Sequence, residues 1–248
     1  MPSQRVVVNA DDLGMSTTIN RAILDGLDAG WLSDASVLAT GPAFAEICPF
    51  LAGRSLGLHA DLSEFPPIRG ELPARLGLDY RLGDHDALVA ELSAQCERLL
   101  DAGMCISHAD SHQHLDYQKY VGAALLVTAR RFNIPFIRRI SNVPPVRKRR
   151  RARSELSARA AYALGVNSLA AFGPAERVQA AIKTGWQPQS LEVMCHPGHV
   201  EARYESEIQW LQTRPFGTAM GSYQSMLPTS TGAGITPMVE IPVRSEDE

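Results

Sequence analysis

Short apolar runs alternate with segments of helical period along the chain. The run Val6-Val7-Val8 is typical of a strand buried on both faces of a parallel sheet. Further apolar runs predict strands at 35–39, 55–59, 105–107, 134–138 and 190–195. Apolar residues recur at helical spacing over about 16–29, 43–51, 86–102, 118–132, 175–184 and 206–212. This alternation predicts an α/β barrel with parallel strands.

Two segments lack a regular pattern. The segment 63–81 contains three prolines and two glycines, and predicts a long surface loop that could act as a substrate lid. The segment 217–248 is rich in Gly, Pro, Ser and Thr, and predicts an irregular C-terminal region. Within it we expect one short strand near 234–241 and a frayed end at 245–248.

Potential metal ligands follow several of the predicted strands. Asp11 and Asp12 end the first strand, His59 the third and His196 the last, while three histidines fall within 108–114. Because the carboxyl ends of parallel strands meet on one rim, we expect these side chains to converge. A set of one Asp and two His suits a divalent cation with open positions for water and substrate. Two alternatives stay open: one acid caps the following helix, or the histidines hold a loop through hydrogen bonds.

Composition narrows the class of protein. The 248 residues suit one α/β barrel or two small domains, and a net charge of −3 argues against a protein whose main function is to bind nucleic acid or an acidic membrane. No secretory signal or membrane-spanning stretch is visible, and the four cysteines show no paired C-x-x-C spacing, so we expect a reduced, cytoplasmic protein. From Arg147 to Arg153 only Ala152 is not basic. This run predicts either solvated surface at a helix start or a clamp for an anionic group.

Four motifs, in this order, resemble those of the YdjC/ChbG family of carbohydrate deacetylases. They are Asn9-Ala10-Asp11-Asp12-Leu13-Gly14, Gly57-Leu58-His59, the run from His108 to His114, and Met194-Cys195-His196-Pro197-Gly198. The resemblance extends from about residue 6 to residue 210. It implies a distorted (β/α) barrel with parallel strands, a single domain over 1–248, one divalent metal ion (zinc or magnesium), and hydrolysis of an N-acetyl group on an amino sugar.

The resemblance also implies roles for individual residues. Asp12 would be the carboxylate ligand of the metal, and His59 and His112 the imidazole ligands. Asp11 would be the general base. His196 would act as the acid that protonates the departing amine.

The resemblance bears on four further positions. Asp110, His114 and Arg138 are expected to bind substrate or to orient the groups that do. For Asp110 we expect either that it holds a ligand imidazole in the right tautomer or that it caps a turn. The sequence departs from the family pattern at Asp116, where a further histidine is usual. This change from a potential cation to an anion near the rim bears on substrate preference.

Two other functions remain open at this stage. One is a metal-dependent phosphoesterase on a similar barrel, and the other is a non-catalytic sugar-binding protein that kept the fold. As partner we expect an N-acetylated sugar, with no nucleic acid and no integral membrane segment. The oligomeric state is open, a homo-oligomer included.

Overall fold

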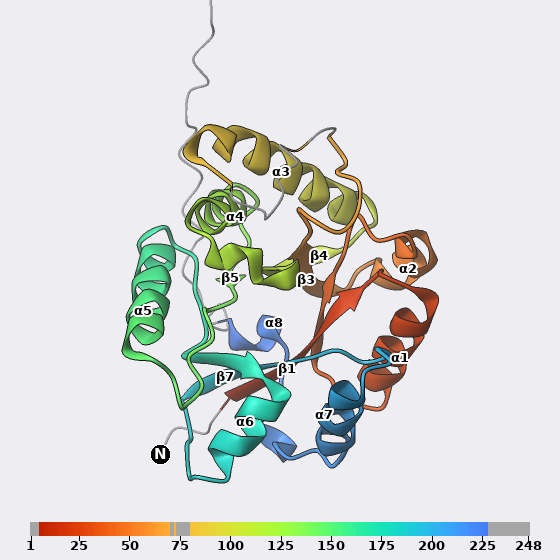
Figure 1. The fold of residues 1–248 in the computed structure, drawn as a ribbon. Coiled ribbons are helices and arrows are strands. Elements are labelled where there is room, and N and C mark those ends of the chain that lie inside the picture. The colour runs from red at the N-terminus through yellow and green to blue at the C-terminus, as the bar shows by residue number, and fades with distance from the viewer. Residues whose placement is uncertain (1–4, 70–71, 73–79, 228–248) are drawn as a thin grey trace, which may run out of the picture.

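The computed structural model describes residues 5–69, 72 and 80–227, which form one curled, parallel β-sheet surrounded by helices (Figure 1). Its strands are β1 (Arg5–Leu13), β2 (Asp34–Val37), β3 (Ser55–Ala60), β4 (Cys105–Ser111), β5 (Phe136–Ile137), β6 (Ala171–Pro174) and β7 (Ser190–Cys195). Their order is β5-β4-β3-β2-β1-β7-β6, and each pair is parallel. The predicted parallel α/β fold is therefore confirmed, as a curled half-barrel in which Phe136 of the edge strand β5 forms an isolated parallel bridge with Asn167, shortly before β6.

Helices cover the outside of this sheet. They are α1 (Thr17–Asp28), α2 (Phe44–Leu51), α3 (His85–Asp101), α4 (Lys119–Arg131), α5 (Lys148–Ala163), α6 (Ala175–Ile182) and α7 (Ala202–Gln212). Short turns of 3-10 helix lie at η1 (Leu82–Asp84), η2 (His112–Tyr117) and η3 (Gly217–Ala219). The last helix, α8 (Tyr223–Met226), lies inside the curl (Figure 1). No helix in the described part of the chain has the length and apolar character needed to cross a bilayer.

The first strand separates two hydrophobic clusters. Val6 and Val8 point to the large core between sheet and helices, whereas Val7 packs inside the curl with Phe136 and Tyr223. All three valines are fully buried, as expected for a strand covered on both faces. Because β1 lies between β2 and β7 near the middle of the sheet, its carboxyl end is fixed by neighbours on both sides.

Two features differ from the sequence-based expectations, and one agrees with them. Strand β6 was not predicted, because its four residues include Gly173 and Pro174, which are poor strand formers. Helix α5 begins inside the basic run, at Lys148, in agreement with the helix start that one interpretation of this run expected. Part of the C-terminal segment expected to be irregular forms η3 and α8. The expected features at 234–241 and 245–248, and most of the expected lid, lie outside the described residues.

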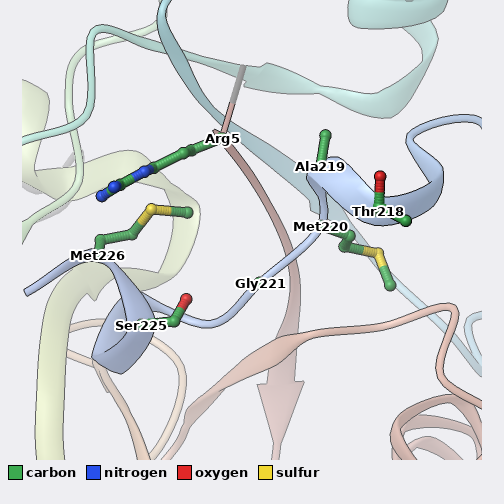
Figure 2. A pocket seen from close by; sticks show the side chains of 7 residues that line it. All are labelled: Arg5, Thr218, Ala219, Met220, Gly221, Ser225 and Met226. Carbon is green, nitrogen blue, oxygen red and sulfur yellow. The ribbon is translucent and has the colours of Figure 1, made fainter. Parts of the chain in front are cut away.

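A cavity of about 350 Å³ lies at the amino end of β1, away from the rim where the predicted ligands gather (Figure 2). It is lined by Arg5 and by residues of the segment that leads into α8: Thr218, Ala219, Met220, Gly221, Ser225 and Met226. With one charged side chain and two thioethers, this lining offers no group of metal ligands or titratable pairs.

Candidate active site

Both acids at the end of β1 are buried and line a cavity of about 470 Å³ at the carboxyl ends of the strands. In a regular strand, successive side chains point to opposite faces. Here the pairing of β1 with β2 shifts between Ala10 and Leu13, and Asp12 has a φ of +72°. This bulge allows Asp11 and Asp12 to reach the same cavity. Neither acid caps α1, because the side chain of Ser16 accepts the N–H of Ile19 and does so instead.

Asp12 lies against two histidines from other strand ends. Its Oδ1 is 3.2 Å from Nε2 of His59 and 3.0 Å from Nδ1 of His112, and these two nitrogens are 3.4 Å apart. Ligands at about 2.1 Å from a tetrahedral zinc ion would be about 3.4 Å apart. The three donor atoms therefore already have the spacing and the chemical character of a divalent-metal site, and Asp12, His59 and His112 could hold one ion.

The ring of His59 is oriented from behind. Its Nδ1 lies 2.5 Å from Oδ1 of Asp110, which leaves Nε2 to face Asp12. The other oxygen of Asp110 accepts a hydrogen bond from the Ser36 hydroxyl at 2.6 Å and pairs with Arg138 at 2.7 Å. A carboxylate behind a ligand imidazole in this way fixes its tautomer and raises its basicity. These contacts fit the first role expected for Asp110, which is to hold a ligand imidazole in the right tautomer. None of them closes a turn.

Arg138 lies at the centre of a buried charge network. It donates two hydrogen bonds to Asp11, at 2.8 and 2.6 Å, and one through Nε to Glu192 at 2.7 Å. Burial alone would raise the pKa of Asp11, but the charges of Arg138 and His59 outweigh it and hold that pKa below its ordinary value. Asp11 is therefore ionised at neutral pH. Burial likewise opposes ionisation of Asp12, and the hydrogen bonds from the surrounding histidines lower its pKa further than burial raises it.

A second group of potential ligands, Asp11, His59 and Asp110, also lies close together. Its two acids are both bonded to Arg138, whose guanidinium already supplies the positive charge between them. The donor set that fits a metal ion is therefore the one around Asp12.

Three more histidines line the cavity. Nε2 of His199 lies 3.0 Å from Oδ2 of Asp12, whereas His59 and His112 contact Oδ1. His196 packs against His199 and Tyr204, its Nδ1 has no hydrogen-bond partner among the described residues, and burial lowers its pKa. His114 stacks on Tyr117 with ring centroids 5.0 Å apart. The remaining lining is mostly polar: Ser111, Gln113, Pro174, Glu176, Met194, Glu201, Arg203, Tyr204 and Glu207.

Two residues expected at this rim lie elsewhere. His108 is fully buried inside the sheet, where it stacks on Tyr223 at 4.0 Å and lies 3.1 Å from the Ser36 hydroxyl. Burial lowers its pKa to about 3, so it is a neutral core residue. Asp116 does not line the cavity either. Its carboxylate is 2.5 Å from the hydroxyl of Ser111, at the start of η2.

Sequence reasoning missed several members of the network. Glu192 lies in the middle of the apolar strand β7, and an acid in that setting is the one signal that could have identified it. Ser36 and Tyr223 gave no comparable signal, since Ser and Tyr are common at both buried and exposed positions. His199, three positions after His196, received no role, although its Nε2 lies 3.0 Å from Asp12.

The fold and the site together define a parallel α/β-barrel protein with an enzyme-like acid and imidazole centre at the carboxyl ends of its strands. The chain belongs to the YdjC-like family, whose model, described as YdjC-like protein, matches residues 5–220.

Two relatives and one solved structure illustrate the similarity. The chain is 29% identical to the carbohydrate deacetylase of Geobacillus stearothermophilus, over 84% of this chain and 85% of the relative. It is 25% identical to the carbohydrate deacetylase of Halalkalibacterium halodurans, over 85% of this chain and 92% of the relative. A solved structure from Enterococcus faecalis superposes with a TM-score of 0.65 at 17% identity, covering 90% of this chain and 99% of the other, and supports the fold alone.

Proposed function

We propose that the protein hydrolyses the N-acetyl group of an acetylated amino sugar, either an oligosaccharide or a lipid-linked glycan. The names of the two relatives support this function, since both are called carbohydrate deacetylases. The observation that carries it is the pair of acids at the end of β1. Asp12 faces two imidazole nitrogens, whereas its neighbour Asp11 is held ionised by Arg138 in the same cavity.

We infer that Asp12, His59 and His112 hold one divalent cation. Two imidazoles and one carboxylate favour zinc over magnesium, which prefers oxygen ligands. When bound, such a cation polarises an amide carbonyl and lowers the pKa of a water molecule. Arg138 lies within hydrogen-bonding distance of both Asp11 and Asp110, so its role is to fix these acids rather than to touch the sugar.

The proton transfers are assigned to Asp11 and His196. Asp11 takes the proton of the attacking water, a role that requires the ionised state that Arg138 maintains. His196 gives a proton to the departing amine nitrogen. Its ring lines the same cavity, and its Nδ1 is committed to no other described group. Acid and base assistance of this kind typically contributes a factor of about 10² to 10⁴. His114 lines the same cavity, and we assign it to contact with the sugar.

The two other functions are less well supported. A phosphoesterase of this kind usually uses two or three metal ions, and the second acid and imidazole group is occupied by the Arg138 guanidinium. A protein that only binds sugar has no need of an ionised acid beside a metal site.

The test is acetate release from a panel of N-acetylated monosaccharides, oligosaccharides and lipid-linked sugars, with metal-stripped protein as the control. Asp11→Asn should keep the metal and lose turnover, whereas Asp12→Ala should lose both. Metal content by mass spectrometry and acetate release are measured on the same samples. Turnover by Asp11→Asn at a rate near the wild type's would refute the assignment of the base. No acetate from any sugar, with phosphate released from a phosphoester and two metals per chain, would favour the phosphoesterase.

A further inference from the structure

A second large cavity, of about 570 Å³, is lined by residues of the first turns of α5. This helix lies at the edge of the molecule (Figure 1). The walls of the cavity are rich in guanidinium groups, which come from the basic run and from α6. The arginines that line it are Arg147, Arg149, Arg150, Arg153 and Arg177, and they are joined by Tyr117, Ile140, Pro145 and Val146. We call this space the arginine cavity.

Several of these arginines are fixed by neutral groups. Arg177 donates to the carbonyl oxygens of Val143 and Pro145, both at 2.8 Å. Arg153 donates to the carbonyl of Tyr117 at 2.5 Å, and the guanidinium of Arg150 lies 5.4 Å from the centre of the Tyr117 ring. Carbonyls and a ring position a cation but leave its charge uncompensated.

No acid neutralises these charges in the part of the chain that the structure describes. The arginines that do form ion pairs there are Arg69, Arg138, Arg139 and Arg203. The one acid of α5, Glu155, pairs with Arg139 at 2.5 Å. Like charges gathered in one cavity repel each other, and an anion bound among them would remove that repulsion. The excess is local, because the whole chain has a net charge of −3.

The donors favour one kind of anion. The planar guanidinium presents parallel N–H groups that match the oxygens of a phosphate, which is why arginine is common wherever phosphate is bound. The volume lies in the range of small-molecule pockets and exceeds the needs of a single inorganic ion. The cavity therefore has room for more than a phosphate group alone.

The arginine cavity shares a wall with the candidate active site. The ring of Tyr117 lines the cavity on one side, and on the other it stacks on His114, which lines the site. Arg177 follows directly on Glu176, which also lines the site.

We propose that the arginine cavity binds a phosphate group, carried either by a soluble phosphorylated compound or by a lipid headgroup. The basic run is exposed at the start of α5, as one of its two interpretations expected, and the proposal adds the anion clamp to that surface. The proposal concerns binding only, so it holds or fails independently of the deacetylase function.

The first test is calorimetric titration with inorganic pyrophosphate. Arg150→Ala is the variant to compare, since its side chain is exposed and should not affect folding. Arg159→Ala is the matched control, because it removes the same charge from the same helix outside the cavity. We expect the dissociation constant to rise at least tenfold for Arg150→Ala and to stay within twofold for Arg159→Ala. Equal losses in both variants would overturn the proposal, as would the absence of Arg150-dependent binding in both this test and the next.

The second test identifies the source of the phosphate. Co-sedimentation is measured with vesicles containing 30% phosphatidylglycerol and, as a control, with pure phosphatidylcholine. Binding to the anionic vesicles that is lost in Arg150→Ala but kept in Arg159→Ala points to a lipid headgroup. Binding of pyrophosphate without sedimentation points to a soluble ligand. If neither measurement depends on Arg150, the basic run is solvated surface only and the proposal is wrong.

Discussion

The Tyr223 hydroxyl is a sensitive point of the buried charge network. Tyr223 is 1% exposed, and its hydroxyl donates to Oε2 of Glu192 at 2.5 Å. The other oxygen of Glu192 is held by Nε of Arg138 at 2.7 Å. Tyr223→Phe removes one oxygen atom and leaves Oε2 of a buried carboxylate without this donor. The ring itself stays, with its stacking on His108 and its contact with Phe136.

The expected cost follows from these contacts. A buried hydrogen bond to a charged group contributes about 1.5 to 3 kcal/mol. Because no apolar volume is lost, we expect the free energy of unfolding to fall by about 2 kcal/mol. Burial is the main cause that raises the pKa of Glu192 to about 7, while Arg138 and the Tyr223 hydroxyl oppose this rise. Without the hydroxyl that pKa rises further, so the loss of stability should be larger at pH 8 than at pH 6.

Urea unfolding followed by circular dichroism at both pH values measures this loss. Tyr162→Phe is the matched control, since Tyr162 is 77% exposed and its change should fall within about 0.5 kcal/mol. A loss for Tyr223→Phe below 0.5 kcal/mol at both pH values would contradict the reasoning. A loss that is larger at pH 6 would show that Glu192 is not the group concerned.

Three further predictions concern other parts of the site and its support. In Gly57→Ala the new Cβ would lie 2.2 Å from a buried imidazole nitrogen, so we expect a loss of about 1 to 3 kcal/mol in urea unfolding, against almost none for the open position Gly83→Ala. Burial raises the pKa of Asp34 to about 8, so the native state keeps a proton that the unfolded state loses from about pH 4 upward. Stability should therefore fall between these pH values by at most about 1.4 kcal/mol per unit, and Asp34→Asn should flatten that slope when unfolding is measured at pH 5 and pH 7. Ser36→Ala removes the hydroxyl that donates to Asp110 at 2.6 Å, and should weaken metal binding roughly tenfold in a chelator competition. Unchanged affinity would argue against the orientation of His59 by Asp110 and Ser36.

Much of the fold could be predicted because each strand except one carries its own apolar signal. Strand β6 carries none, since its pairing with β7 is a tertiary effect. The absence of a side chain at Gly173 is part of its packing. A Cβ there would lie 2.4 Å from Cγ2 of Val143. Gly173 therefore weakens the strand signal in the sequence, but it also lets the segment around Val143 approach the strand.

The candidate ligands could be predicted from strand ends, but the network behind them could not. Asp12 and His59 end strands that pack in one sheet, so their convergence follows from topology alone. The partner of Asp11 is Arg138, 127 residues away, and nothing in the local sequence indicates that Arg138 bridges three acids. Bulges add a second difficulty, because the positive φ of Asp12 reverses the side-chain alternation on which a sequence pattern depends.

The position of His108, which was expected at the rim, shows what the alternation of side chains along a strand can and cannot predict. His108 and Asp110 lie two positions apart in β4, so they share a face of the sheet, but His108 is about 6 to 7 Å deeper along the strand. At that depth it lies inside the curl against Tyr223 instead of at the rim. The position that follows the strand is different again. Asp116 binds Ser111 through both its carboxylate and its N–H, and so closes the turn that carries His112 into the site. A residue that follows a strand in the sequence can therefore stabilise a turn of the site without lining the cavity. The charge of Asp116 accordingly bears first on the geometry of this turn and only then on the choice of substrate.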